Sequence, residues 1–167
     1  MDFVTRTANI NDTDLLVRLR LDYLAADWGE LPDTGRAALA AQLRPFFAAR
    51  IADETCVTVI AEKAGPGHGG ALVTPEVAAF ATILFSERFA SPKAPDGRVA
   101  TVYNVLTYPA YRRQGLARRV LGALIDEARA RGVSLIELEA TADGRPLYER
   151  LGFTASDHYT PMSLSLR

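Results

Sequence analysis

The sequence has little of the chemistry that holds metal ions or disulfides. Its 167 residues include one cysteine, Cys56, and two histidines, His68 and His158. A single cysteine excludes an intrachain disulfide, and these three side chains do not have the spacing of a zinc site. The sequence also lacks a run of about 18 apolar residues and an apolar amino-terminal stretch typical of a secretory signal. We therefore expect a soluble, cytoplasmic protein with no membrane partner.

An excess of charge of one sign is also missing. The chain has 19 Lys and Arg against 20 Asp and Glu, which gives a formal net charge of −1. Binding to nucleic acid or to an anionic membrane relies on a basic excess, so neither is expected as a partner. A hydrophobic content of 49% with 23% charged residues is typical of a globular protein. The length fits one domain over residues 1–167.

Neither of two common nucleotide-binding motifs is present in a working form. Gly65–Gly70 reads GPGHGG and formally matches G-x-G-x-x-G. That motif must open a helix, whereas residues 71–75 lead into an expected strand, so we interpret the segment as a hairpin loop with a solvated His68. No Gly-Lys-Ser/Thr follows a glycine-rich loop, which excludes a P-loop nucleotide enzyme.

Hydrophobic periodicity predicts an alternation of strands and helices. The expected strands are Phe3–Thr7, Cys56–Glu62, Glu76–Phe85, Val99–Thr107, Ser134–Ala140, Phe153–Tyr159 and Met162–Leu166. The expected helices are one capped by Asn11 or Asp12 and ending near Leu24, one from Thr34 to Ile51 interrupted at Pro45, Leu116–Arg131, and Arg145–Leu151. Ala25–Pro32 and Ser86–Arg98 are expected as loops.

A basic turn between a strand and a helix is the most informative stretch. The strand ends before Pro109, and Arg112 to Gly115 then lead into the helix that starts at Leu116. The first N–H groups of a helix have no internal partner and carry partial positive charge. Gly115 lets an anion approach the backbone, and the arginines add charged donors suited to phosphate. The turn therefore predicts an anion site, and the alternative is a solvated turn capping an ordinary helix.

Two motifs resemble one protein family. Arg112–Ala117 has the spacing Arg-x-x-Gly-x-Ala and resembles the pyrophosphate loop of the GNAT N-acetyltransferase superfamily. Leu147–Phe153 reads LYERLGF and is similar to the Leu-Tyr-Glu-Lys-x-Gly-Phe element found late in that family. The resemblance covers about Val99–Phe153. It implies an α/β GNAT fold: a central mixed, mostly antiparallel sheet of six or seven strands with a splayed parallel pair, flanked by about four helices.

The resemblance implies acetyl-CoA as the acyl donor and assigns residues to it. The donor-binding residues it implies are Val105, Leu106, Thr107, Arg112, Arg113, Gln114, Gly115, Leu116, Ala117, Arg118, Thr141 and Tyr148. One N–H of the 105–107 backbone would stabilise negative charge on the thioester oxygen. Tyr148 would protonate the departing thiolate, because a phenol with a pKa near 10 can meet a thiol with a pKa near 8.5. The alternative role for Tyr148 is packing in the core.

The general base is not identified by the resemblance. Many family members carry a glutamate in the strand that corresponds to Val99–Thr107, where this chain has Tyr103 and Asn104. Asn104 has no basic group but can orient an acceptor or a water. Glu30, Glu139 and His158 are candidate bases that would act through water, and Thr141 stands where many relatives have an asparagine that contacts the donor.

The expected function is the transfer of an acetyl group from acetyl-CoA to a primary amine of a small molecule or peptide. Direct attack in a ternary complex is expected, because no cysteine lies near the motifs to form an acyl intermediate. The alternative is a non-catalytic acyl-CoA-binding sensor or regulatory module. Tyr23, Trp28 and Phe89 suggest an aromatic patch facing the acceptor. Oligomeric state is left open, although a homodimer is common among proteins of this kind.

Overall fold

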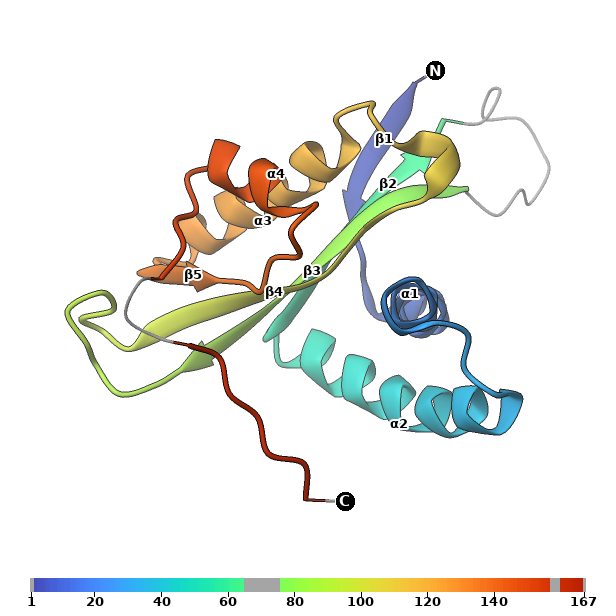
Figure 1. Ribbon diagram of the computed structural model, residues 1–167, viewed down its shortest axis with the longest axis horizontal. Coiled ribbons are helices and arrows are strands. Elements are labelled where there is room, and N and C mark those ends of the chain that lie inside the picture. Colours follow the sequence, from blue (N-terminus) through green and yellow to red (C-terminus); the bar gives the residue numbers. More distant parts are fainter. Residues whose placement is uncertain (1, 65–75, 157–159, 167) are drawn as a thin grey trace.

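A five-stranded mixed sheet forms the centre of the molecule (Figure 1). The structure, a computed structural model, describes residues 2–64, 76–156 and 160–166. The strands follow chain order across the sheet: β1 (Phe3–Thr7), β2 (Cys56–Lys63), β3 (Val77–Glu87), β4 (Arg98–Thr107) and β5 (Leu135–Glu137). Neighbours from β1 to β4 are antiparallel, and β5 lies parallel to β4. The mixed, mostly antiparallel sheet expected from the sequence is confirmed.

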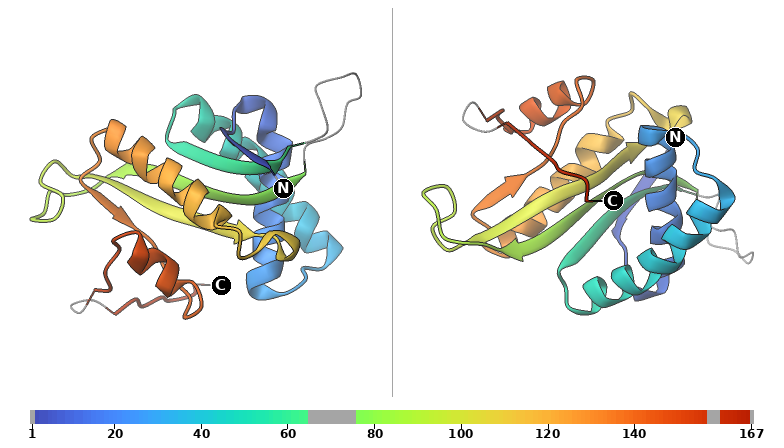
Figure 2. Two further views of the ribbon diagram at one scale, coloured as in Figure 1. Left: turned by 90° about the horizontal axis from the view of Figure 1, so that it is seen from above. Right: turned by 60° about the horizontal axis from the view of Figure 1, so that its bottom comes forward.

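Helices cover both faces of the sheet (Figures 1 and 2). The helices are α1 (Thr13–Trp28), α2 (Asp33–Ala52), α3 (Leu116–Ala130) and α4 (Arg145–Arg150), with short 3-10 turns η1 (Ile10–Asp12) and η2 (Pro109–Tyr111). One face carries α1 and α2, and the other carries α3, with α4 packed at its side. No helix among the described residues is long and apolar enough to span a membrane.

The two faces bury separate hydrophobic clusters because strand residues alternate between them. On one face, Ile60 and Phe80 pack with Leu16, Leu19 and Phe47 from α1 and α2. On the other face the strands present small residues to α3. The α3-side cluster includes Ala79, Ala81, Ile83, Val120, Leu121 and Leu124. The central position expected for the 76–85 strand is confirmed, since β3 is buried on both faces over most of its length.

Three expectations for the elements were wrong in part. α1 continues past Leu24 to Trp28 and ends at Gly29, whose φ of 89° a side chain would disfavour. Pro45 was expected to produce a kink or two shorter helices, and α2 runs through it as one helix, so the two shorter helices are not formed. The closing strands expected after Phe153 are not formed within residues 153–156 and 160–166, so the described sheet has five strands and not six or seven. A segment with an alternating pattern forms a strand only where a neighbouring strand pairs with it. β5, the last strand in the sheet order, is short and ends at Glu137.

An ion-pair network joins the first strand to its neighbour. Arg6 on β1 binds Asp12 and the buried Glu62 of β2, each at 2.8 Å. The hydrogen bond from Arg6 lowers the pKa of Asp12 below its ordinary value. A carboxyl group with a lowered pKa stabilises the fold above its unfolded pKa, near 3.9, and that stabilisation is lost as the pH falls through the folded value.

Arg6→Gln is therefore expected to lower the free energy of unfolding by about 1–2 kcal/mol at pH 7. The deficit should shrink at an acidic pH that lies below the lowered pKa of Asp12, because the carboxyl group is then protonated and its ion pair with Arg6 is lost. Urea unfolding at the two pH values measures it. Arg44→Gln is the matched control, because the exposed Arg44–Asp14 pair should contribute almost nothing. An Arg6→Gln deficit that is equal at both pH values would assign the loss to packing.

Candidate active site

The parallel pair of strands separates along its length. β4 and β5 pair only at Val99–Leu135, Ala100–Ile136 and Thr101–Glu137. β4 continues to Thr107, while β5 ends at Glu137. Within residues 2–64, 76–156 and 160–166, no strand pairs with the β5-facing edge of β4 beyond Thr101. The backbone of residues 102–107 therefore borders a gap, as the expected splayed pair requires.

A β-bulge lies beside this gap. Tyr103 pairs with Thr82 and Leu106 with Phe80, so two β4 residues, Asn104 and Val105, stand opposite a single residue of β3. Asn104 has a φ of 55°, which asparagine tolerates better than most residues, and its side chain is buried. A bulge leaves an extra backbone unit outside the ladder and re-aims the strand. Backbone polar groups at 104–106 are thereby available for a ligand.

The turn between β4 and α3 is shaped for an anion. Arg113 and Gly115 both have positive φ, 65° and 77°, and Gly115 is the residue that caps α3. The amides of Leu116 and Ala117 stand in the first turn of α3, where no internal acceptor is available. A Cβ built on Gly115 meets no heavy atom within 4 Å, so the space above this backbone is open. Successive amides around left-handed residues form concave anion sites.

The arginines of this turn have different surroundings. The Nε of Arg112 donates to the carbonyl oxygen of Thr107 at 3.3 Å and ties the turn to the end of β4. Arg119 donates to the Phe3 carbonyl at 2.9 Å, which anchors the start of α3 to β1. Arg113 and Arg118 are exposed. The turn is thus held from two sides while its outer surface carries free positive charge.

Tyr148 is brought from α4 toward residues of α1. Its ring packs against Phe153 in an edge-to-face contact, with centroids 6.1 Å apart. Burial raises the pKa of Tyr148 above the ordinary value, and nearby Tyr23 raises it further. Burial also raises the pKa of Tyr23, and the negative charges of Asp27 and Glu139 add to that rise. A raised pKa keeps the Tyr148 phenol protonated, as a proton donor requires.

Other expected site residues lie as follows. Thr141 is exposed, and its Oγ1 accepts the Gly144 N–H at 3.1 Å in the turn that leads into α4. Glu30 and Glu139 are both exposed. His68 and His158 lie outside the described residues. The expected aromatic patch is not formed, because Phe89 lies on the β3–β4 loop at the far end of the sheet from α1 (Figures 1 and 2).

A cavity of about 210 Å³ opens on the α1–α2 side of the bulge. Its lining comes from five elements and includes Arg20, Leu43, Phe46, Phe47, Cys56, Thr82, Leu84, Tyr103 and Asn104. Arg20 donates a hydrogen bond to the Oδ1 of Asn104. Sequence reasoning missed Arg20. The available signal was a charge on the apolar stripe of α1, four residues after the buried Leu16.

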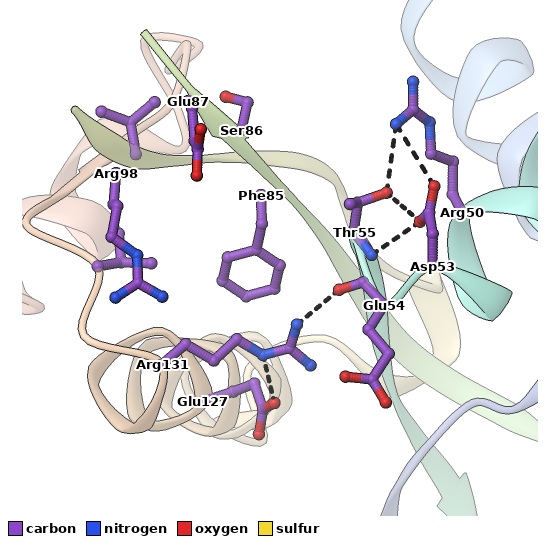
Figure 3. A pocket seen from close by; sticks show the side chains of 12 residues that line it. Arg50, Asp53, Glu54, Thr55, Phe85, Ser86, Glu87, Arg98, Glu127 and Arg131 are labelled. Carbon is purple, nitrogen blue, oxygen red and sulfur yellow. Dashed lines mark hydrogen bonds and ion pairs between the residues drawn. The ribbon is translucent and has the colours of Figure 1, made fainter. Parts of the chain in front are cut away.

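A larger cavity of about 850 Å³ lies at the opposite end of the sheet, near the start of β4 (Figure 3). Arg131 stacks on the Phe85 ring at 4.4 Å and pairs with Glu127 at 2.7 Å. Arg50 pairs with Asp53 on the other side. Charged residues of both signs line this cavity, and none of the expected site residues takes part.

Comparison with known proteins identifies the family. A family model described as the acetyltransferase (GNAT) family matches residues 30–153, well over half of the chain. The chain belongs to this family. The match includes the bulged strand, the turn at Arg113–Gly115 and α4. The GNAT fold expected from the two sequence motifs is confirmed.

Solved GNAT structures superpose on nearly the whole chain. A predicted acetyltransferase with acetyl-CoA from Clostridium acetobutylicum is 27% identical, with a TM-score of 0.79 over 97% of this chain and 96% of that chain. A GCN5-related N-acetyltransferase from Ralstonia eutropha JMP134 has a TM-score of 0.78 at 21% identity, covering 97% of this chain and 99% of that chain. At 21% identity, the similarity to the Ralstonia eutropha protein shows a shared fold alone.

Curated GNAT relatives match over a shorter stretch. The [ribosomal protein bS18]-alanine N-acetyltransferase of Escherichia coli is 47% identical over 57 residues, which are 32% of this chain and 38% of that protein. The corresponding protein of Haemophilus ducreyi is 38% identical over 69 residues, 38% of this chain and 48% of that protein. The chain therefore spans less than half of the curated relatives it matches.

Proposed function

We propose that this GNAT protein is an acetyl-CoA-dependent N-acetyltransferase acting on a primary amine, with residues 1–167 forming one GNAT domain. One juxtaposition carries the proposal. The bulged edge of β4, which no strand of the described residues pairs with beyond Thr101, leads through η2 into the left-handed turn at Arg113–Gly115 and the start of α3. An extended thioester arm fits along a strand edge, and a pyrophosphate fits at a helix N-terminus. The two sites are contiguous, as a ligand with both parts requires.

The residues present fit such a donor. The backbone of Val105, Leu106 and Thr107 would hold the arm, with Thr141 on the opposite side of the gap. The amides of residues 113–117, with the side chains of Arg112 and Arg118, would hold the pyrophosphate. The open space above Gly115 gives the phosphate oxygens room to approach these amides. The donor supplies an acetyl group activated as a thioester.

The reaction requires the protein to stabilise developing negative charge and to transfer protons. The lone pair of the acceptor amine attacks the thioester carbonyl carbon, a C–N bond forms, and the C–S bond breaks with its electron pair going to sulfur. A backbone N–H at the bulge donates to the carbonyl oxygen while negative charge develops there. The Tyr148 hydroxyl gives its proton to the departing sulfur. The amine must lose a proton to a base or to solvent.

The remaining roles are to position the acceptor and to take its proton. Asn104 stands where a carboxylate base is common and has no basic group, so we assign it to orienting the acceptor. Glu30, Glu139 and His158 stay the three candidate bases, each acting through a water that would carry the proton. Among them, the charge of Glu139 acts on Tyr23.

A non-catalytic acyl-CoA-binding module is the second candidate, and the lack of a carboxylate on β4 favours it. Thiol release from acetyl-CoA with a panel of amines, followed with a disulfide reagent, separates the two. The protein's own thiol will not interfere, because burial raises the pKa of Cys56, its only cysteine, to about 11. Amine-dependent release supports the enzyme. Stabilisation of the fold by acetyl-CoA without release from any amine would favour the binding module.

A further inference from the structure

Arg20 lines the 210 Å³ cavity and has no carboxylate partner within residues 2–64, 76–156 and 160–166. Its contacts among the described residues are a hydrogen bond to Asn104 Oδ1 and the face of the Tyr23 ring, 5.5 Å from its Cζ. Two of the three acids on α1 pair with arginines of α2: Asp14 with Arg44 at 2.7 Å, and Asp22 with Arg36 at 3.4 Å. The third, Asp27, acts on Tyr23.

A half-buried guanidinium of this kind is suited to bind an anion. It has five N–H donors, and the neutral Asn104 oxygen accepts from only one of its nitrogens. Desolvating a charge without a counter-ion is unfavourable, so a ligand carboxylate would relieve that cost. Its planar fork matches the two oxygens of a carboxylate.

The rest of the cavity is mostly apolar, and the cavity is small. Its apolar lining residues include Leu43, Phe46 and Phe47 of α2 and Leu84 of β3. A volume of about 210 Å³ corresponds to roughly seven water molecules at about 30 Å³ each. That space accommodates one amino-acid side chain and excludes a folded partner. Phe46 is partly exposed, so the cavity can be reached from solvent.

We infer that the acceptor is a free α-amino acid with an apolar side chain, held by its carboxylate on Arg20. This inference rests on the proposed N-acetyltransferase function and adds the acceptor class. Asn104 belongs to the bulge, so a carboxylate on Arg20 lies next to the proposed reaction centre. In an α-amino acid the amine and carboxylate share one carbon, which brings the amine to the bulge while the side chain enters the cavity. At the N-terminus of a protein, the carbon that bears the amine carries an amide where a free amino acid has its carboxylate. Such an acceptor would lack the anion that Arg20 binds.

The test compares each amino acid with its amide, in which the carboxylate is replaced by a neutral carboxamide. Thiol release from acetyl-CoA is measured with phenylalanine, phenylalaninamide, leucine, leucinamide and a peptide beginning with alanine. Rates are corrected for the fraction of unprotonated amine, which differs between an amino acid and its amide. Wild-type protein is expected to prefer each amino acid over its amide by at least about 10-fold in kcat/KM, since a charge-assisted bidentate contact is lost in the amide.

Variants assign the preference to Arg20. Arg20→Gln should lower kcat/KM for phenylalanine by about 10–100-fold and leave phenylalaninamide nearly unchanged. Arg20→Lys should restore part of the difference. Arg18→Gln, an exposed arginine of the same helix, is the matched control and should change neither substrate.

Equal kcat/KM values for amide and acid would overturn the inference, as would a preference for the acid that survives in Arg20→Gln. Neither result would contradict the proposed N-acetyltransferase function. The remaining case is a protein that binds an amino acid but transfers no acetyl group. Calorimetric binding of phenylalanine in the presence of CoA tests for it. Arg20-dependent binding without thiol release from any amine would contradict the proposed function and uphold the amino-acid site.

Discussion

Gly115→Val is expected to abolish measurable binding of acetyl-CoA while the protein remains folded. The valine side chain would occupy the open space above the backbone, where the proposed site has a phosphate approach the amides of α3. In wild-type protein, acetyl-CoA at 100 times its Kd should add about 2.7 kcal/mol to the free energy of unfolding. We expect this increment to vanish in the variant. Thermal or urea unfolding with and without acetyl-CoA measures it.

Backbone strain has to be separated from the loss of the phosphate site. A valine at the φ of 77° found for Gly115 costs about 1–2 kcal/mol in any setting. Gly29 offers a matched control: its φ is 89°, and a Cβ there also meets no atom within 4 Å. Because its ψ of 171° lies in a region that is almost restricted to glycine, Gly29→Val should be destabilised at least as much as Gly115→Val and still gain stability from acetyl-CoA. If Gly115→Val gains it as well, the turn is only a helix cap.

Tyr148→Phe is expected to lower kcat by about 10²–10⁴-fold with little change in acetyl-CoA binding. The phenylalanine keeps the ring that packs on Phe153 and removes only the hydroxyl that would protonate the leaving sulfur. Steady-state thiol release and binding calorimetry measure the two effects separately. Full activity in the variant would assign Tyr148 to packing alone.

The pH profile gives a second test of the same residue. The pKa of Tyr148 is raised, so its acid form is present below that value and is lost as the pH rises through it. Wild-type kcat should therefore fall only above the ordinary phenol value near 10, and Tyr148→Phe should lack this fall. Tyr111→Phe is the control, because it removes a hydroxyl bonded to Glu76 and should preserve the profile.

Local sequence patterns were sufficient for the order of elements and for much of the candidate site. The Arg112–Ala117 spacing marked the turn, because a glycine at a helix start and flanking arginines are adjacent in the chain. Tyr148 was found through its motif on a short helix. These features depend on neighbours within a few residues, which is the range over which periodicity and turn chemistry act.

The features that the sequence did not reveal depend on contacts between distant segments of the chain. The left-handed Asn104 follows from a register shift against β3 and is invisible in a run of β-forming residues. The bond between Arg20 and Asn104 joins positions 84 residues apart. The alternating Met162–Leu166 predicted a strand, but a strand needs a neighbour, and none pairs with it within the described part of the chain.

The short pairing of β4 with β5 has a consequence for amide hydrogen exchange. Three residue pairs hold the parallel strands together, so amides of residues 102–107 that face β5 have no strand acceptor among the described residues. These amides should exchange rapidly, while neighbouring amides bonded to β3 are protected. A ligand lying along this edge would take the place of a missing strand. Slowed exchange at alternate residues of β4 on adding acetyl-CoA would show which amides it engages.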